Sequence, residues 1–134
     1  MPVFLDTNII LRHLLRDDEE KAYRCKDFLS QLEQAKIKAR TSDIVIHEVV
    51  FVLERTYRQP KAEIRDLLLP IILFPGLILP GKRQYARAFD LYVGKNISFA
   101  DASNAALMER LNITEVVSYD LHFDRIEGLK RIEP

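Results

Sequence analysis

The amino-acid sequence predicts an α/β fold built around a mainly parallel sheet of short strands. Short apolar runs alternate with longer segments of helical periodicity along the whole chain, which is typical of strand–helix–strand units. The 134 residues contain no internal repeat, low-complexity tract or long linker. With 48% hydrophobic and 30% charged residues, the chain has the composition of one globular domain with its own core. We therefore expect a single domain over residues 1–134.

The first half of the chain is expected to contain two strands and three helices. Residues 3–5 are apolar, which favours a short buried strand, and the apolar residues of the second helix recur at helical spacing. The third helix is rich in β-branched residues, so a strand is conceivable, but its lack of Gly, Pro and alternation favours a helix. In chain order we expect a strand over 3–5, helices over 8–16 and 19–36, a strand over 39–41, and a helix from Ser42 or Asp43 to about residue 57.

The second half is expected to continue the alternation. Pro60 suits the first turn of a helix, and Pro70 should kink that helix. Gly94 should stop a later helix, and residues 98–101 have the form of a capping box that opens another. The remaining elements that we expect are a strand over 77–79, a helix over 84–93, a strand over 116–118 that ends near Asp120, and a short strand over 130–132.

Two aspartates follow predicted strands. Asp6 comes directly after the first apolar run, and Asp120 comes shortly after the run Val116–Val117. Ligands of parallel sheets bind beyond the carboxyl ends of the strands, so both side chains are predicted to point into one crevice. The structural alternative is that each aspartate only caps the helix that follows it.

Glu48 stands in an unusually apolar segment. Between Ile44 and Leu53 the polar side chains are those of His47 and Glu48, so the helix is expected to be buried on most of its surface. A buried carboxylate needs a cation, a hydrogen-bond partner or a water-lined cleft. The alternative is that Glu48 lies on a solvent-facing rim close to Arg55 or Arg12.

Asp101 has both a structural and a functional interpretation. It occupies the acidic position of the predicted capping box, where a negative charge stabilises the positive end of a helix. Together with Asp6, Glu48 and Asp120 it would form an acidic cluster that repels itself at neutral pH. Such a cluster persists where a divalent cation neutralises it or where some of its pKa values are raised. Oxygen ligands of this kind suit Mg²⁺ or Mn²⁺, which can clamp phosphate oxygens and activate a water molecule.

Charge, cysteine content and histidine spacing limit the other classes of function. Lys and Arg total 20, and so do Asp and Glu, which excludes a strongly basic nucleic-acid binder. The single cysteine, Cys25, cannot form an internal disulfide and excludes a cysteine-based zinc or iron–sulfur site. The longest apolar run is broken by Pro75 and Gly76, and the histidines fit no zinc-protease spacing. We expect a cytoplasmic protein that does not enter the membrane.

Four segments of the sequence resemble the PIN-domain ribonucleases, and within that family the VapC-type toxins of toxin–antitoxin pairs. The segments are FLDTNIILR at 4–12, HEVVFVLER at 47–55, FADASNAA at 99–106 and VVSYDLHF at 116–123. They occur in the family's order and cover almost the whole chain. The resemblance implies a three-layer α/β/α domain whose catalytic and metal-binding residues are Asp6, Glu48, Asp101 and Asp120.

The resemblance also implies a reaction and partners. The family hydrolyses RNA phosphodiester bonds with Mg²⁺ or Mn²⁺, many members form homodimers, and an antitoxin covers the acidic cleft. Asn8 and Ser118 match polar positions that support the metal ligands. One departure is that His122 stands where members often have a further acid, so that Asp124 is expected to substitute or a second metal is expected to bind weakly.

Two questions stay open at this point. Arg12 and Arg16 lie four residues apart after Asp6 and are candidates for contacts with RNA phosphates, although ordinary solvated charges are the alternative. The neutral net charge and His122 also fit a non-catalytic binding module whose acidic cleft docks a basic peptide. A phosphatase or DNA nuclease built on the same acids is a third interpretation. The identity of the RNA is not encoded in any motif.

Overall fold

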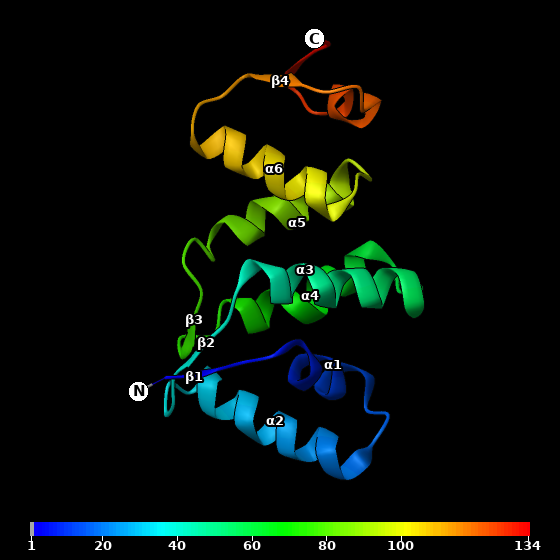
Figure 1. Ribbon diagram of the computed structural model, residues 1–134. Helices are drawn as coiled ribbons and strands as arrows, with labels where there is room; N and C mark the ends of the chain where they lie inside the picture. The colour runs from blue at the N-terminus through cyan, green and yellow to red at the C-terminus, as the bar shows by residue number, and fades with distance from the viewer. Residues whose placement is uncertain (1) are drawn as a thin grey trace. The chain divides into compact units, whose positions relative to one another are not determined.

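The computed structural model describes residues 2–134, and residue 1 lies outside this range. The chain divides into two compact units, Met1–Lys82 and Arg83–Pro134, which we call unit 1 and unit 2 and describe separately. Both units combine helices with short parallel strands (Figure 1). The predicted α/β class with a mainly parallel, short-stranded sheet is therefore confirmed.

Unit 1 alternates strands and helices in the predicted order. Its first helix begins at Thr7, directly after Asp6, and its second ends before Ala35, whose φ of 57° is left-handed. That second helix is shorter than the predicted range of 19–36 because a left-handed residue cannot continue a right-handed helix. The elements are β1 Val3–Phe4, α1 Thr7–Leu15, α2 Glu19–Glu33, β2 Ala39–Arg40, α3 Asp43–Phe51, the π-helix η1 Val52–Thr56, α4 Lys61–Ile72 and β3 Leu77–Ile78.

The three strands of unit 1 form one parallel sheet in the order β1-β2-β3. Val3 pairs with Ala39, and Ala39 pairs with Leu77. The prediction that residues 3–5 are buried is wrong for Val3 and Phe4, whose exposed fractions are 55% and 59%. Their strand lies at an edge of this sheet, whereas Leu5, just after it, is 2% exposed. The buried end of β1 therefore lies immediately before Asp6.

The predicted helix over 42–57 forms as α3 followed directly by η1. Ser42 caps it, because its side-chain oxygen accepts a hydrogen bond of 3.3 Å from the Val45 amide. The core face is aliphatic and includes Ile46 and Val49, both fully buried. The prediction of a helix buried on most of its surface is only partly right, since Ile44 is 78% exposed. In η1 the hydrogen bonding changes from α-helical to π-helical, which alters the directions of the side chains. Such changes are often found near functional residues.

Helix α4 of unit 1 contains Pro70 and continues to Ile72. Its N-cap is Pro60, one residue earlier than the predicted place inside the first turn. Ile64, Leu68 and Ile72 are fully buried and follow one face of the helix. Each such aliphatic side chain stabilises a fold by about 1.5–3 kcal/mol when removed from water, so this face anchors the segment that leads into β3.

Unit 2 is built on two helices and a two-stranded parallel sheet. Its elements are α5 Gln84–Gly94, α6 Phe99–Arg110, β4 Glu115–Val117, the 3₁₀ helix η2 Leu121–Arg125 and β5 Lys130–Ile132, with β4 paired to β5. Aromatic rings fill the space between α5 and α6. The ring centroids of Phe89 and Phe99 lie 4.8 Å apart, and those of Tyr92 and Phe99 lie 5.3 Å apart. This cluster holds the first turn of α6, where Asp101 lies.

The turn after α5 corrects one prediction. Gly94 was expected to stop the helix, but Gly94 is its last residue and Asn96 takes the left-handed φ of 50°. Asparagine adopts this conformation more readily than most residues, so it can replace glycine at a helix end. Within residues 2–134, no helix combines the length and apolar composition that a membrane span requires.

Candidate functional site

Unit 1 holds Glu48 through a hydrogen bond. The Thr7 hydroxyl donates to Glu48 Oε2 at 2.9 Å, and this contact joins the first turn of α1 to α3 across 41 residues of sequence. Thr7 is only 4% exposed. Two of the alternatives left open for Glu48 are found together, since its side chain has a hydrogen-bond partner and is also exposed to solvent. The proposed arginine neighbours have other partners, since Arg55 pairs with Glu54 and Arg12 with Asp17.

Asp6 occupies the N-cap position of α1, immediately before Thr7. Its backbone is extended, with φ −91° and ψ 160°, and its exposed side chain forms no capping hydrogen bond within the described part of the chain. The structural interpretation of Asp6 as a helix cap is therefore not supported by a cap contact. Its carboxylate is free to take a ligand beside the residue that orients Glu48.

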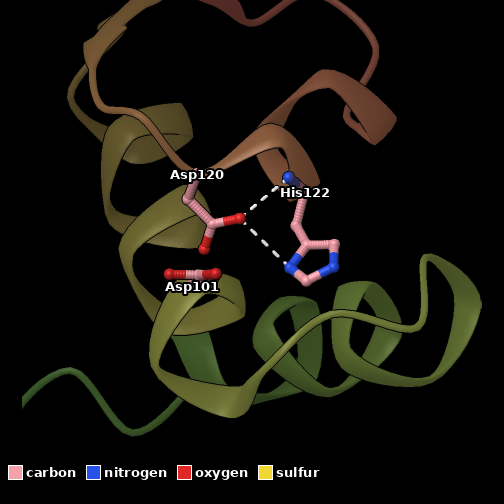
Figure 2. A group of neighbouring side chains, drawn as sticks. All are labelled: Asp101, Asp120 and His122. Carbon is pink, nitrogen blue, oxygen red and sulfur yellow. Dashed lines mark hydrogen bonds and ion pairs between the residues drawn. The ribbon is translucent and has the colours of Figure 1, made fainter.

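Unit 2 brings Asp101, Asp120 and His122 together (Figure 2). Asp120 lies at the N-cap of η2, and its Oδ1 accepts a hydrogen bond of 2.9 Å from the His122 amide. The Nδ1 atom of the same histidine lies 3.1 Å from that oxygen. The Asp120 amide in turn donates to the Ser118 hydroxyl oxygen at 2.9 Å. Backbone and side-chain contacts thus fix Asp120 from both sides.

Asp101 reaches this group from the first turn of α6. The predicted helix cap is confirmed, because the Asp101 amide donates to the Ser98 hydroxyl oxygen at 3.1 Å. Figure 2 shows the two aspartates facing each other, Asp101 from the helix and Asp120 from the segment that follows β4. The capping role and the site role of Asp101 therefore coexist: the backbone amide serves the cap, while the carboxylate faces Asp120.

The two aspartates of unit 2 differ in acidity because of their surroundings. Partial burial, and then the hydrogen bond and negative charge of Asp120, raise the pKa of Asp101. The hydrogen bond from the His122 amide, followed by the hydrogen bond with Asp101, lowers the pKa of Asp120. Asp101 is therefore the less acidic member of the pair. A cation placed between the carboxylates would relieve the repulsion between their negative charges.

The donor atoms of unit 2 fit a divalent metal ion. One ligand atom from each of Asp101, Asp120 and His122 can be chosen so that all three lie within 4.8 Å of one another. Ligands about 2.1 Å from an octahedral ion lie about 3 Å apart when adjacent and about 4.2 Å apart when opposite. The limit of 4.8 Å lies slightly above these separations, so small side-chain movements would bring two carboxylates and one imidazole into a common coordination sphere.

Asp124 was expected to substitute for the acid that His122 replaces. In unit 2 it instead accepts a hydrogen bond of 3.1 Å from Arg131 Nε. The same arginine also contacts Glu133 at 3.0 Å and the Ser118 carbonyl oxygen at 3.1 Å. Arg131 thereby ties β5 to the segment before Asp120. Asp124 serves this ion pair, and His122 is the side chain that faces Asp120.

The remaining predicted residues lie around the start and end of α1. Asn8 is exposed in the first turn of that helix. Arg12 is inside the helix, but Arg16 lies at its C-cap with a left-handed φ of 52°. The two arginines therefore do not share one regular helix face as predicted, because Arg16 has left the helix. Ser118, the other supporting residue, contacts the Asp120 amide in unit 2.

The sequence patterns give no positive role to two residues at these sites. Thr7 lies within the segment FLDTNIILR, and its position directly after Asp6 is the signal that could indicate its role. His122 departs from the family's acidic pattern, but its spacing of two residues after Asp120 suits the turn that the structure shows. The structure joins Glu48 to Thr7, the residue after Asp6, within unit 1, and it groups Asp101 and Asp120 with His122 within unit 2.

The chain matches the sequence model of the PIN domain over residues 3–129, which spans both units. It therefore belongs to the PIN domain family. This membership confirms the family resemblance and the fold class that the sequence predicts. Among curated proteins, the VapC ribonuclease of Aquifex aeolicus (strain VF5) is 29% identical to it over 133 residues, covering 97% of this chain and 95% of the relative.

Proposed function

We propose that this protein is a ribonuclease that hydrolyses RNA phosphodiester bonds with Mg²⁺ or Mn²⁺ and acts as the toxin of a toxin–antitoxin pair. The observation that carries the proposal is the grouping of Asp101, Asp120 and His122, whose ligand atoms lie within 4.8 Å of one another. Family membership and the relative named a VapC ribonuclease support the choice of RNA as substrate. A bound divalent ion would supply Lewis acidity toward the phosphate and lower the pKa of the attacking water.

The protein's own residues have separate tasks in this proposal. Asp101, Asp120, Asp6 and Glu48 hold the cation, and Thr7 fixes the rotamer of Glu48 through its 2.9 Å hydrogen bond. Ser118 orients Asp120 through the backbone amide. Preorganised carboxylates matter because the ion must be held in place before the phosphate binds. Asn8 is proposed to support the metal ligands, and Arg12 and Arg16 are proposed to contact phosphates of the RNA.

The proposal also covers assembly and location. We propose that residues 1–134 form one PIN domain, since the family model runs through both units. A homodimer, an antitoxin that covers the acidic residues, and a cytoplasmic location are proposed on the resemblance of the four sequence segments. A basic antitoxin segment would match the carboxylates in charge. The target RNA would be chosen by shape and phosphate placement.

Cleavage of RNA by the purified protein tests the activity. We expect cleavage with Mn²⁺ or Mg²⁺, loss of cleavage with a chelator, and a fall of about a hundredfold or more in Asp6→Asn. Asp66→Asn is the matched control, because Asp66 is an exposed aspartate of α4 that pairs with neighbouring Arg65. Cleavage without a divalent metal, or full activity in Asp6→Asn, would refute the mechanism.

Calorimetry separates the nuclease from the non-catalytic binding module. A nuclease of the proposed kind binds Mn²⁺ at a specific site that Asp101→Asn and Asp120→Asn weaken. A docking module would bind a basic peptide with the same acids but show no specific metal site. Binding of the peptide without any saturable uptake of Mn²⁺ would therefore replace the nuclease proposal with the docking one.

A further inference from the structure

His122 is the residue of the unit 2 group that the family pattern does not explain. It stands at a position where a carboxylate is frequent, and it is the non-acidic member of the group in unit 2. Two contacts hold it against Asp120: its amide donates to Asp120 Oδ1 at 2.9 Å, and its Nδ1 lies 3.1 Å from the same oxygen. The ring is 52% exposed, so the core of unit 2 does not dictate its orientation.

We propose that His122 is a nitrogen ligand of the divalent-ion site and makes that site prefer Mn²⁺ over Mg²⁺. The inference rests on the proposed metal dependence and adds a ligand and a selectivity to it. The distance of 3.1 Å between Nδ1 and Oδ1 equals the separation of two adjacent ligands about 2.2 Å from an octahedral ion. A cation about 2.2 Å from both atoms would lie beside the line that joins them, so it would bind where the two side chains already meet.

The donor chemistry gives the direction of the preference. Mg²⁺ is a hard ion that prefers carboxylate, carbonyl and water oxygens, and it loses water reluctantly. Imidazole nitrogen best suits first-row transition ions such as Zn²⁺, Fe²⁺ and Ni²⁺. Mn²⁺ has the lowest affinity in that series, but it belongs to it and, unlike Mg²⁺, it is expected to accept imidazole nitrogen beside carboxylate oxygen. A site with two carboxylates and one imidazole carries less negative charge than a site with three carboxylates. Exchanging carboxylate for imidazole thus weakens Mg²⁺ more than Mn²⁺.

The neighbouring acid cannot take over the role of His122 in unit 2. Asp124 Oδ1 is held by Arg131 Nε at 3.1 Å, and Arg131 is itself only 14% exposed. Releasing Asp124 toward the metal would leave a largely buried guanidinium with fewer partners, which is unfavourable. His122 therefore remains the third donor beside Asp101 and Asp120.

Two variants of the full-length protein test the proposal. His122→Asp restores the frequent acid, and His122→Asn removes the ring while retaining a small polar side chain. Mn²⁺ affinity is measured from the electron paramagnetic resonance signal of the free ion, and Mg²⁺ affinity is measured by competition. We expect the ratio of Mn²⁺ to Mg²⁺ affinity to fall about tenfold or more in His122→Asp. His122→Asn should weaken Mn²⁺ about 10–100-fold.

Pulsed electron paramagnetic resonance of bound Mn²⁺ reads the ligand directly. We expect a nitrogen coupling of directly bound imidazole in the wild type, its loss in His122→Asp, and its retention in His47→Asn. His47 is the matched control because it is the histidine next to another proposed ligand, Glu48. A wild-type spectrum without nitrogen coupling, an unchanged affinity ratio in His122→Asp, or no uptake of Mn²⁺ would overturn the inference.

The result for His122 as a metal ligand can be separated from the result for RNA cleavage. Nitrogen coupling in a protein that cuts no RNA supports the ligand and rejects the nuclease. RNA cleavage dependent on Mn²⁺, with no nitrogen coupling, supports the nuclease and rejects His122 as a ligand. Circular dichroism of the variants verifies folding, which the exposure of the His122 ring leads us to expect.

Discussion

Units 1 and 2 hold their acidic side chains by different physical means. In unit 1, Glu48 is fixed by the neutral hydroxyl of a buried threonine, and Asp6 lies exposed beside it. In unit 2, Asp101 and Asp120 face each other, and partial burial together with the neighbouring carboxyl group of Asp120 raises the pKa of Asp101. The first arrangement orients a carboxylate through a hydrogen bond, whereas the second brings two carboxyl groups close together, so that a cation bound between them would relieve their repulsion. We therefore expect unit 2 to contribute more than unit 1 to the proposed metal affinity.

The cores beneath these acids differ as well. The face of α3 that precedes Glu48 is aliphatic, with Ile46 fully buried, whereas the start of α6 rests on an aromatic cluster that includes Phe99. Ile46 lies two residues before Glu48, and Phe99 lies two residues before Asp101. Each acid is therefore positioned by a large buried side chain on its own helix.

The largest effect on the free energy of unfolding should come from truncating Phe99 and Ile46, the buried side chains beneath the acids. We expect Phe99→Ala to lower the free energy of unfolding by about 3–5 kcal/mol and Ile46→Ala by about 2–5 kcal/mol, because both leave a cavity. Urea denaturation measures the loss. If the chain is one domain, as proposed, hydrogen exchange should rise in both units for each variant. Faster exchange confined to the unit that carries the substitution would contradict the single domain.

Much of the fold could be predicted because its elements are encoded locally. Ser42 and Ser98 cap helices at the places where capping chemistry predicts them. The errors arise where two local solutions are nearly equivalent. Asn96 rather than Gly94 takes the left-handed turn after α5, and both residue types tolerate that conformation. The exposure of Val3 and Phe4 follows from a strand order that no local pattern specifies.

The sites were harder to predict than the fold because their contacts are distant in sequence. Periodicity places Glu48 on a helix, but it does not indicate that Thr7, 41 residues earlier, is the partner. Nor does charge counting assign Asp124 to Arg131 rather than to a metal. The family resemblance named the acids, and the structure adds the neutral and aromatic groups that position them.

A smaller effect on stability is expected when the Thr7 hydroxyl, which orients Glu48, is removed. Thr7→Val keeps the shape but removes the donor, so it should lower the free energy of unfolding by about 1 kcal/mol, since Glu48 is exposed and can bond to water instead. Thr7→Ser retains the donor and serves as the control. Metal affinity should fall less in Thr7→Val than in Asp101→Asn. An equal or larger fall would show that unit 1 contributes more than the comparison assigns to it.

The smallest effect that we expect is the change in the free energy of unfolding in mild acid. This change should also differ between the units. Burial lowers the pKa of His13 and of His47, both in unit 1, below the ordinary histidine value of 6.5. A histidine with a depressed folded pKa adds stability that is present above the unfolded pKa and is lost as the pH falls through the folded pKa. Asp101 in unit 2 has the opposite sign, because a raised carboxyl pKa adds stability at low pH that is lost as the pH rises through the folded value.

Between about pH 7.5 and pH 5.5 the histidines should dominate, so the free energy of unfolding should decrease on acidification. His13→Leu removes one titrating ring whose buried Nδ1 atom forms no hydrogen bond within the described residues, and it should make this decrease shallower. Urea midpoints across this range measure the slopes. A slope in His13→Leu as steep as that of the wild type would mean that the acid response of unit 1 does not come from the desolvation of this ring.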